Sequence, residues 1–230
     1  TPMAASDGKS IACAWGDYDG DGWTDLFVAN TSVAGEDRAD NELYRNEGDG
    51  TFTRITEGAL VSSTEWSIGA AWADYDQDGH LDLFVCNFRE PNGLYHNDGD
   101  GTFTRITEGD IATGDDASFT PAWVDYDLDG DLDLFVANNL GNSFPADDNA
   151  LYRNDDGVFV RVTDTVLGQD GAEAVSTSWA DYDNDGDPDC FVATQNWNDA
   201  TNLLYRNEGD GTFTQVTGID VVTDDLNSFG

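Results

Sequence analysis

One nine-residue motif, Asp-x-Asp-x-Asp-Gly-x-x-Asp, occurs four times in this chain of 230 residues. The first Asp of each copy follows that of the previous copy by 57, 51 and 56 residues, a spacing typical of structural repeat arrays. Any fold for this sequence must therefore be built from four similar units. The four copies, called the Asp loops below, are Asp17–Asp25, Asp74–Asp82, Asp125–Asp133 and Asp181–Asp189.

The residues around each Asp loop follow one plan. An apolar segment that ends in Trp precedes the loop, and a short apolar run centred on Phe follows it. A Leu-Tyr segment and a glycine turn then lead into a Thr-Phe-Thr type segment, and such turns supply the positive-φ positions of hairpins. No apolar stripe with a 3.6-residue period persists, so helices are not expected. Each unit predicts four short antiparallel strands, and four such sheets predict an all-β fold of the β-propeller type.

The repeat also predicts where each four-stranded blade lies. We expect one domain over residues 1–230, and we expect a chain that starts at Thr1 to be a processed or excised product. The final Ser228–Gly230 resembles the Ser67–Gly69 segment that opens a first strand. Residues 218–230 are therefore expected to start a fifth inner strand or to pair with another subunit. The blades are expected at approximately residues 9–57, 66–108, 117–164 and 173–217.

The Asp loops predict calcium sites. Carboxylates at positions 1, 3, 5 and 9 of one tight loop repel one another unless a hard, oxygen-seeking cation lies among them. Glycine at position 6 allows the sharp turn, and the backbone carbonyl at position 7 offers another oxygen. An EF-hand would need Glu at position 12, where this chain has Val. We expect about four Ca²⁺, one per repeat, each a structural clip. The predicted ligands are Asp17, Asp19, Asp21, Trp23 and Asp25; Asp74, Asp76, Asp78, His80 and Asp82; Asp125, Asp127, Asp129, Asp131 and Asp133; and Asp181, Asp183, Asp185, Asp187 and Asp189.

These motifs resemble a known family. The segment Asp17-Tyr18-Asp19-Gly20-Asp21-Gly22 with Asp25, its three counterparts, and the Ser-Ile-Gly and Ser-Phe-Gly segments resemble the FG-GAP or VCBS-type repeats of integrin-α-like propellers. The resemblance covers almost the whole chain and implies a calcium-binding β-propeller. Complete propellers of this type usually have seven blades. Either these four units close alone, or they form part of a larger ring, or the last segment pairs with another molecule.

Charge and cysteine content limit the partners and the location. The 47 Asp and Glu residues against nine Lys and Arg give a net charge of -38, which disfavours nucleic acid and anionic membranes as partners. No apolar run is long enough for membrane insertion. Cys13, Cys86 and Cys190 are odd in number and stand where other repeats have small or apolar residues, so we expect buried thiols. Because weak Ca²⁺ sites fill at extracellular concentrations, we expect an extracellular or cell-surface protein.

The aromatic residues fall into two groups. Those that recur at one position of every repeat, including all eight Tyr and Trp15, are interpreted as core. Four others fall in the connections opposite the Asp loops, where the repeats differ most. We predict that they form a face for a carbohydrate or protein ligand; the alternative is that each packs against its own blade. These residues are Trp66, Phe88, Phe144 and Trp197.

No catalytic residue is predicted, and the chain is not expected to be an enzyme. His80 lies at a backbone-ligand position of an Asp loop, and His96 replaces an Arg that the other repeats share. The carboxylate pairs have the spacing of metal loops rather than of a hydrolytic dyad. We predict a calcium-binding extracellular propeller for adhesion or recognition. The alternatives are a subunit of a homo-oligomer or filament joined through Asp224 to Gly230, and, less favoured, the scaffold of a polysaccharide lyase or hydrolase.

Overall fold

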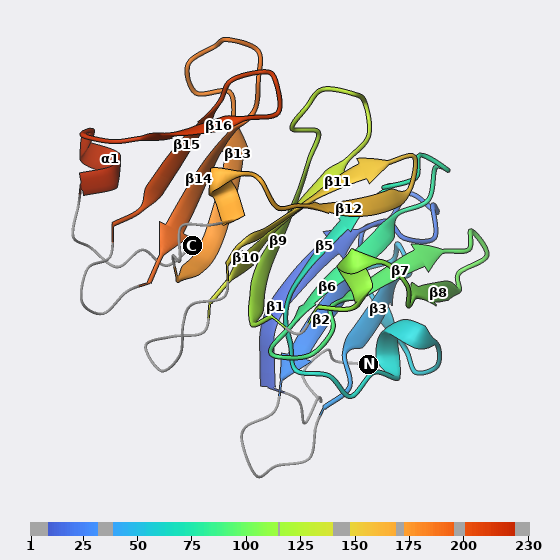
Figure 1. Ribbon diagram of the computed structural model, residues 1–230. Coiled ribbons are helices and arrows are strands. Elements are labelled where there is room, and N and C mark those ends of the chain that lie inside the picture. Colours follow the sequence, from blue (N-terminus) through green and yellow to red (C-terminus); the bar gives the residue numbers. More distant parts are fainter. Residues whose placement is uncertain are drawn as a thin grey trace. The chain divides into compact units, whose positions relative to one another are not determined.

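A computed structural model describes residues 9–31, 39–114, 116–139, 148–168, 173–195 and 201–223 (Figure 1). It contains four four-stranded antiparallel sheets, each with its strands in chain order, which confirms the predicted all-β, propeller-type fold. The first sheet consists of β1 (Lys9–Gly16), β2 (Asp25–Thr31), β3 (Glu42–Asn46) and β4 (Phe52–Ile55). The second consists of β5 (Ser67–Ala73), β6 (Asp82–Asn87), β7 (Gly93–Asn97) and β8 (Phe103–Ile106). The third consists of β9 (Ser118–Val124), β10 (Asp133–Asn138), β11 (Ala150–Asp155) and β12 (Val158–Val162). The fourth consists of β13 (Ala174–Ala180), β14 (Asp189–Thr194), β15 (Leu203–Asn207) and β16 (Phe213–Val216).

Short helical turns follow the fourth strand of each sheet. They are η1 (Ala59–Val61), η2 (Asp110–Ala112), η3 (Val166–Gly168) and α1 (Asp220–Thr223). The prediction of a fifth strand over residues 218–230 is therefore wrong for 220–223, where apolar residues form a helical turn as they do after the other sheets. Residues 224–230 lie outside the described part of the chain. Within that part, no helix is long and apolar enough to cross a membrane.

The strands of one sheet differ in burial because of their place in it. Every residue of β6 and of β10 is buried, and both strands read as a continuous apolar run between an Asp and an Asn. Strands buried on both faces are expected to lack alternation. The outer strand β4 shows partly buried and exposed positions instead. Apolar content therefore falls from the second strand of a blade to its fourth.

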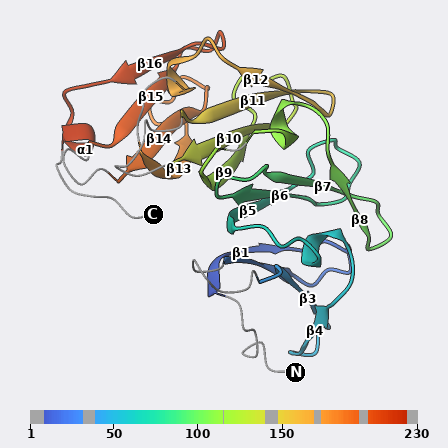
Figure 2. The same cartoon turned by 60° about the horizontal axis from the view of Figure 1, so that its bottom comes forward.

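The chain divides into two compact units, residues 1–115 and 116–230. In unit 1 the two sheets lie one above the other, with β1 next to β5 (Figure 2). The Trp72 ring of β5 stacks on Tyr18 at 6.3 Å and meets Phe27 edge-on at 6.4 Å, and its Nε1 donates to the Ala14 carbonyl at 3.2 Å. A Cβ at Gly16 would lie 2.9 Å from the Trp72 ring, so glycine leaves the space that this ring needs.

Unit 2 repeats this packing with its own residues. Trp179 of β13 meets Phe135 of β10 edge-on at 5.7 Å, and Tyr126 meets Phe213 at 5.9 Å. Phe135 is fully buried, as its counterpart Phe27 is in unit 1. In each unit the recurring Trp of the second sheet thus covers the first sheet.

Three residues predicted to be buried are exposed. Trp15 is 56% exposed, Tyr182 is 46% exposed and Cys13 is exposed, whereas Cys86 and Cys190 are buried as predicted. Tyr18 and Tyr126 are buried against aromatic rings of the other sheet of their unit, Trp72 and Phe213. Trp15 and Cys13 lie on the side of the first sheet that faces away from the second, and among the described residues of unit 2 no counterpart of Trp72 lies over Tyr182. Burial of a recurring residue therefore depends on the blade beside it as well as on its own blade.

Candidate metal centres

Each Asp loop connects the first and second strands of its blade, and its carboxylates converge. In all four loops the Asp residues at positions 1, 3 and 9 place one oxygen each within 4.8 Å of the others. Three of the five predicted ligand positions therefore come together in every repeat. The four groups are Asp17, Asp19 and Asp25; Asp74, Asp76 and Asp82; Asp125, Asp127 and Asp133; and Asp181, Asp183 and Asp189.

Backbone amides hold the first carboxylate of each loop in place. Asp17 Oδ1 accepts from the Asp21 amide at 3.1 Å and Asp17 Oδ2 from the Gly22 amide at 2.9 Å. Gly22 has φ +90°, a conformation that side chains other than glycine rarely adopt. The fixed glycine at position 6 thus lets the chain turn back onto the first carboxylate.

The Asp at position 9 is the buried anchor of each loop. Asp133 is 0% exposed; its Oδ2 accepts from the Tyr126 amide at 3.1 Å and its Oδ1 from the Asn154 amide at 2.8 Å. The same two bonds recur at Asp25, Asp82 and Asp189. One carboxylate therefore connects the Asp loop to the third strand.

Burial raises the pKa of the anchor Asp in the first three loops. The pKa of Asp25 and of Asp82 is raised to about 6, and that of Asp133 to about 7, first because burial disfavours the charged carboxylate. Backbone hydrogen bonds oppose this shift, and neighbouring carboxylates add to it. A divalent cation among these groups would favour their ionised form.

The carboxylate oxygens fit a hard cation. Asp74 Oδ1, Asp125 Oδ1 and Asp127 Oδ1 are buried without a hydrogen-bond partner. Oxygen atoms in this condition are costly to bury, and an all-oxygen donor set matches Ca²⁺. The residues present therefore suit the predicted metal.

Position 5 differs from positions 1, 3 and 9. Asp21 Oδ1 accepts from the Trp23 amide at 2.8 Å, and the equivalent Asp of the other loops does the same. Among the described residues, the groups of side chains that could hold a metal ion include only one Asp from position 5, which is Asp78. A ligand role for position 5, and for the carbonyl at position 7, stays a prediction.

His96 is a candidate ligand that the sequence reasoning did not identify. Its Nδ1 lies 3.2 Å from Asp76 Oδ2 and 3.3 Å from Asp82 Oδ1, and it groups with Asp76 and Asp78. In the other repeats an Arg stands here and pairs with an acid two residues later, as Arg45 does with Glu47 at 2.8 Å. The sequence feature that could have identified it is the replacement of this recurring Arg by His in the second repeat alone, which places a His beside the second Asp loop.

The other end of each blade, called the variable edge, comprises the connections from second to third strand and from fourth strand to the next blade. A buried Asn stands before each third strand, and its Oδ1 accepts from a backbone amide at the end of the second strand at 2.8 to 3.2 Å; the donors are Asn30, Asn87, Asn138 and Thr194. The sequence reasoning missed this Asn, although it precedes the Leu-Tyr segment in every repeat. The connections from second to third strand differ in sequence, but each starts and ends at this same hydrogen bond. The four residues are Asn41, Asn92, Asn149 and Asn202.

Two of the four predicted ligand-face residues can be placed at the variable edge. Trp66 and Phe88 are partly buried and stack at 5.9 Å with 23° between their planes, and the Arg89 guanidinium lies 5.5 Å from the Phe88 ring. Glu90 Oε2 accepts from the Trp66 amide at 3.0 Å. The pair packs on itself and keeps part of its surface open. Phe144 and Trp197 lie outside the described residues.

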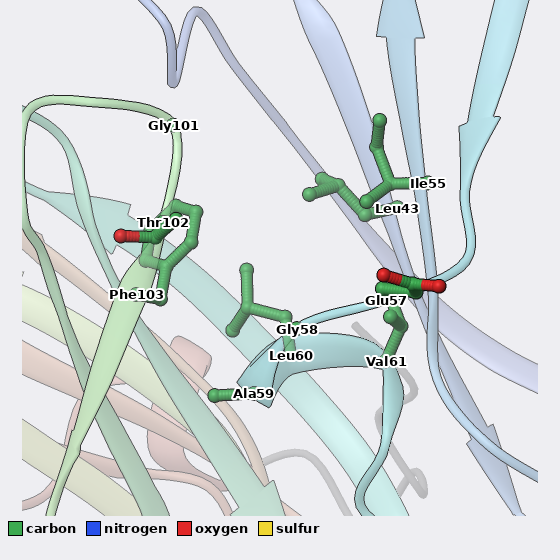
Figure 3. Close-up of a pocket in the computed structure, with 10 residues that line it drawn as sticks. All are labelled: Leu43, Ile55, Glu57, Gly58, Ala59, Leu60, Val61, Gly101, Thr102 and Phe103. Atoms are coloured by element: carbon green, nitrogen blue, oxygen red, sulfur yellow. The ribbon is translucent and has the colours of Figure 1, made fainter.

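A small apolar pocket lies between the two sheets of unit 1 (Figure 3). Leu60 of η1 points between Phe103 on one side and Leu43 with Ile55 on the other. The volume is about 80 Å³, below the roughly 300 Å³ at which small-molecule sites begin. The pocket suits an apolar side chain rather than a sugar.

Comparisons with known proteins agree with the repeat and the fold. A model of the FG-GAP-like repeat matches residues 17–85, 74–136, 125–192 and 181–229. Human cartilage acidic protein 1 is 30% identical over 135 residues, which are 56% of this chain and 19% of that protein. The Xenopus tropicalis protein of the same name is 29% identical over 128 residues, 54% of this chain and 18% of that protein.

Two solved structures share the fold at low sequence identity. An Agrocybe aegerita lectin specific for non-reducing terminal N-acetylglucosamine aligns with a TM-score of 0.52 and 18% identity, over 96% of this chain and 53% of the lectin chain. The Dos1 propeller aligns with a TM-score of 0.55 and 14% identity, over 91% of this chain and 50% of that chain. The chain therefore spans about a fifth of the curated relatives and about half of these solved chains.

Proposed function

The chain belongs to the family of FG-GAP-like repeat proteins, and on that premise we propose that it is an extracellular, calcium-binding propeller module for adhesion or recognition. In this proposal the Asp loops hold about four structural Ca²⁺, and the variable edge binds a carbohydrate or protein ligand. Bound Ca²⁺ would neutralise carboxylates that the fold has already brought together. The protein's own residues position the carboxylate oxygens and connect them to the strands.

The observation that carries the proposal is the buried Asp at position 9. A carboxylate such as Asp133, fully buried and bonded to two backbone amides, lies beside two further carboxylates in the same loop. The arrangement occurs in all four repeats, so a loop without a cation would carry the same repulsion four times. A structural metal site in every blade removes that cost.

An extracellular setting is supported by chemistry and by relatives. Weak Ca²⁺ sites fill where ambient Ca²⁺ is high, and two relatives bear the name of a cartilage protein. The net charge of -38 supports partners other than nucleic acid and anionic membrane. These points support the location and restrict the partners.

Recognition is assigned to the variable edge because its loops differ while the ends of its connections do not. The buried Asn before each third strand gives the connections fixed starting points, as binding loops need. The stacked Trp66 and Phe88, with Arg89 beside them, offer an aromatic and cationic surface that suits a sugar face or a protein side chain. The proposed role is binding, and no residue is given a catalytic one.

A binding screen tests the ligand face. The chain is applied to arrays of glycans and matrix proteins in Ca²⁺ and in EDTA, and a Trp66→Ala/Phe88→Ala variant is compared with Trp15→Ala. Trp15 is 56% exposed on β1, outside the Asp loops and the variable edge, so it controls for loss of a surface aromatic residue. We expect Ca²⁺-dependent binding that the double variant loses by tenfold or more and the control keeps. Binding that survives the double substitution would refute this assignment.

A further inference from the structure

The second Asp loop differs from the other three in one neighbouring side chain. His96 of β7 stands where the other repeats have Arg45, Arg153 and Arg206. Each of these Arg side chains turns to the acid two residues later, at 2.6 to 2.8 Å. In three repeats this position therefore pairs a cation with a surface acid outside the Asp loop.

The His96 side chain turns to the Asp loop instead. Its Nδ1 lies 3.2 Å from Asp76 Oδ2 and 3.3 Å from Asp82 Oδ1. The acid two residues later, Asp98, accepts from two threonine hydroxyls at 3.1 Å. Because β7 lies beside β6 in the second sheet, a side chain of the third strand reaches the loop that precedes the second strand (Figure 1).

The contact between His96 and these carboxylates lacks the geometry of a hydrogen bond. Its Nδ1 is buried and has no hydrogen-bond partner, although two carboxylate oxygens lie within 3.3 Å. A protonated imidazole that paired with Asp76 would direct its N–H at the carboxylate. Two ligands of a tetrahedral metal ion with bonds of about 2.0 to 2.1 Å lie roughly 3.3 Å apart. The two nitrogen–oxygen distances therefore match the spacing of atoms around one ion.

Three side chains converge at this point. One oxygen each of Asp76 and Asp78 and a ring nitrogen of His96 lie within 4.8 Å of one another. The Tyr75 ring meets the imidazole edge-on at 6.4 Å, which restricts rotation of the His96 side chain. The fully buried Asp82 adds negative charge behind the imidazole. A cation here would meet one nitrogen and several carboxylate oxygens that the fold already holds together.

The donor atoms distinguish this loop from the others by the metal that they suit. Ca²⁺ takes oxygen ligands, whereas imidazole nitrogen suits Zn²⁺ and related first-row divalent ions. In the described residues of the other three loops, the grouped ligand atoms are carboxylate oxygens alone. The Arg beside each of those loops has no lone pair to offer a metal. Only the second loop therefore combines nitrogen and oxygen ligands within the described part of the chain.

We propose that the second Asp loop binds a divalent transition-metal ion of the Zn²⁺ type in preference to Ca²⁺, with His96 Nδ1, Asp76 and Asp78 as ligands. Asp76 also belongs to the carboxylate group of this loop, so a Zn²⁺ held by His96 takes the place of its Ca²⁺. Without zinc the loop takes Ca²⁺ as the others do. This inference rests on the proposed metal-binding role of the Asp loops, yet it requires Ca²⁺ in none of the other three.

The proposed ion would have a structural consequence for the second blade. In the other repeats only the Asp at position 9 connects the loop to the third strand, through a backbone amide such as that of Asn154. A Zn²⁺ between Asp76 and His96 adds a second connection, from the loop to a side chain of β7. Zinc should therefore raise the Tm of the chelator-treated protein, and this increase should depend on His96.

Equilibrium dialysis with elemental analysis tests the proposal. The chain is dialysed in saturating Ca²⁺ against a series of ZnCl₂ concentrations, and both bound metals are counted. We expect one Zn²⁺ to bind per chain and one Ca²⁺ to leave. The variant His96→Arg restores the residue of the other repeats and should bind Zn²⁺ at least about tenfold more weakly, with its Ca²⁺ content unchanged.

The same variant controls for adventitious zinc. It keeps the exposed His80 and the exposed Cys13, so zinc bound at either residue would remain. An unchanged Tm in Ca²⁺ without zinc shows that the variant is folded. Zinc uptake that His96→Arg leaves unchanged would overturn the proposal.

Anomalous diffraction at the zinc edge locates the ion directly. We expect a peak about 2.0 to 2.1 Å from His96 Nδ1, and a peak only at other residues would contradict the site. The result is separable from the calcium role. A chain that binds Zn²⁺ through His96 but takes up no Ca²⁺ would support this site and refute that role. Four bound Ca²⁺ that zinc does not displace would support the calcium role and overturn this inference.

Discussion

The Asp-loop end of each blade repeats almost residue for residue, whereas the variable edge changes in length and composition from blade to blade. Both ends use the same physical device, since a buried polar side chain accepts hydrogen bonds from backbone amides. At the loop end this is a charged Asp such as Asp133, and at the variable edge it is a neutral Asn such as Asn149. On the proposed calcium role, the charged end must keep its carboxylates and therefore cannot vary. The neutral end carries no charge that a cation must balance, and its loops are free to differ.

Removal of Ca²⁺ should have the largest effect, because it acts on the loop end of all four blades. Binding at a hundredfold excess over Kd contributes about 2.7 kcal/mol per site. Emptying every site should lower the Tm by more than about 10 °C. Differential scanning calorimetry in Ca²⁺ and in EDTA measures this. An unchanged Tm would show that the loops are stable without metal.

Asp133→Asn should be the most damaging single change at the loop end. An amide cannot accept from both the Tyr126 and the Asn154 backbone amides, so one buried donor loses its partner. We expect a loss of about 2 to 4 kcal/mol in the free energy of unfolding, and lower Ca²⁺ affinity. The exposed Asp110→Asn controls for the lost charge and should stay within about 0.5 kcal/mol of the parent. Equal effects from the two variants would contradict the anchor role.

Asn149→Ala tests the variable edge in the same blade. Asn149 is 2% exposed and its Oδ1 accepts from the Asn138 amide at 2.9 Å. Its removal should cost about 1 to 3 kcal/mol in urea unfolding. Ca²⁺ affinity, measured on the folded variant, should not change because the Asp loop lies at the other end of the blade. Loss of Ca²⁺ affinity would mean that the two ends are not independent.

A change of pH should alter stability through the loop end alone, and this effect should be smaller than those of the changes above. In the metal-free protein the pKa values of Asp25, Asp82 and Asp133 lie at about 6 to 7, above the unfolded value of about 3.9. Their contribution to stability is therefore present at low pH and is lost as pH rises through 6 to 7. In EDTA the protein should melt higher at pH 5 than at pH 8. In saturating Ca²⁺ the order should reverse, because Ca²⁺ binds the ionised carboxylates. A parallel pH dependence in both buffers would contradict this.

Local sequence was enough to predict the strands, the turns and the converging Asp residues, because each depends on spacing within one repeat. Burial across blades could not be predicted in this way. Trp15 and Tyr182 occupy the same repeat positions as Trp72 and Tyr18, yet they are exposed, because burial at these positions depends on the blade beside them and not on the local sequence. His96 was recognisable only as a break in the Arg column, since its approach to Asp76 depends on where the loop and the third strand meet.

The number of Ca²⁺ ions that the chain binds tests the central claim most directly. Isothermal titration calorimetry of the chelator-treated protein with CaCl₂ should give about four ions per chain, one for each Asp loop. Asp133→Asn should reduce this number by one or weaken one site in four. A folded chain that takes up no Ca²⁺, with melting unaffected by it, would contradict the account.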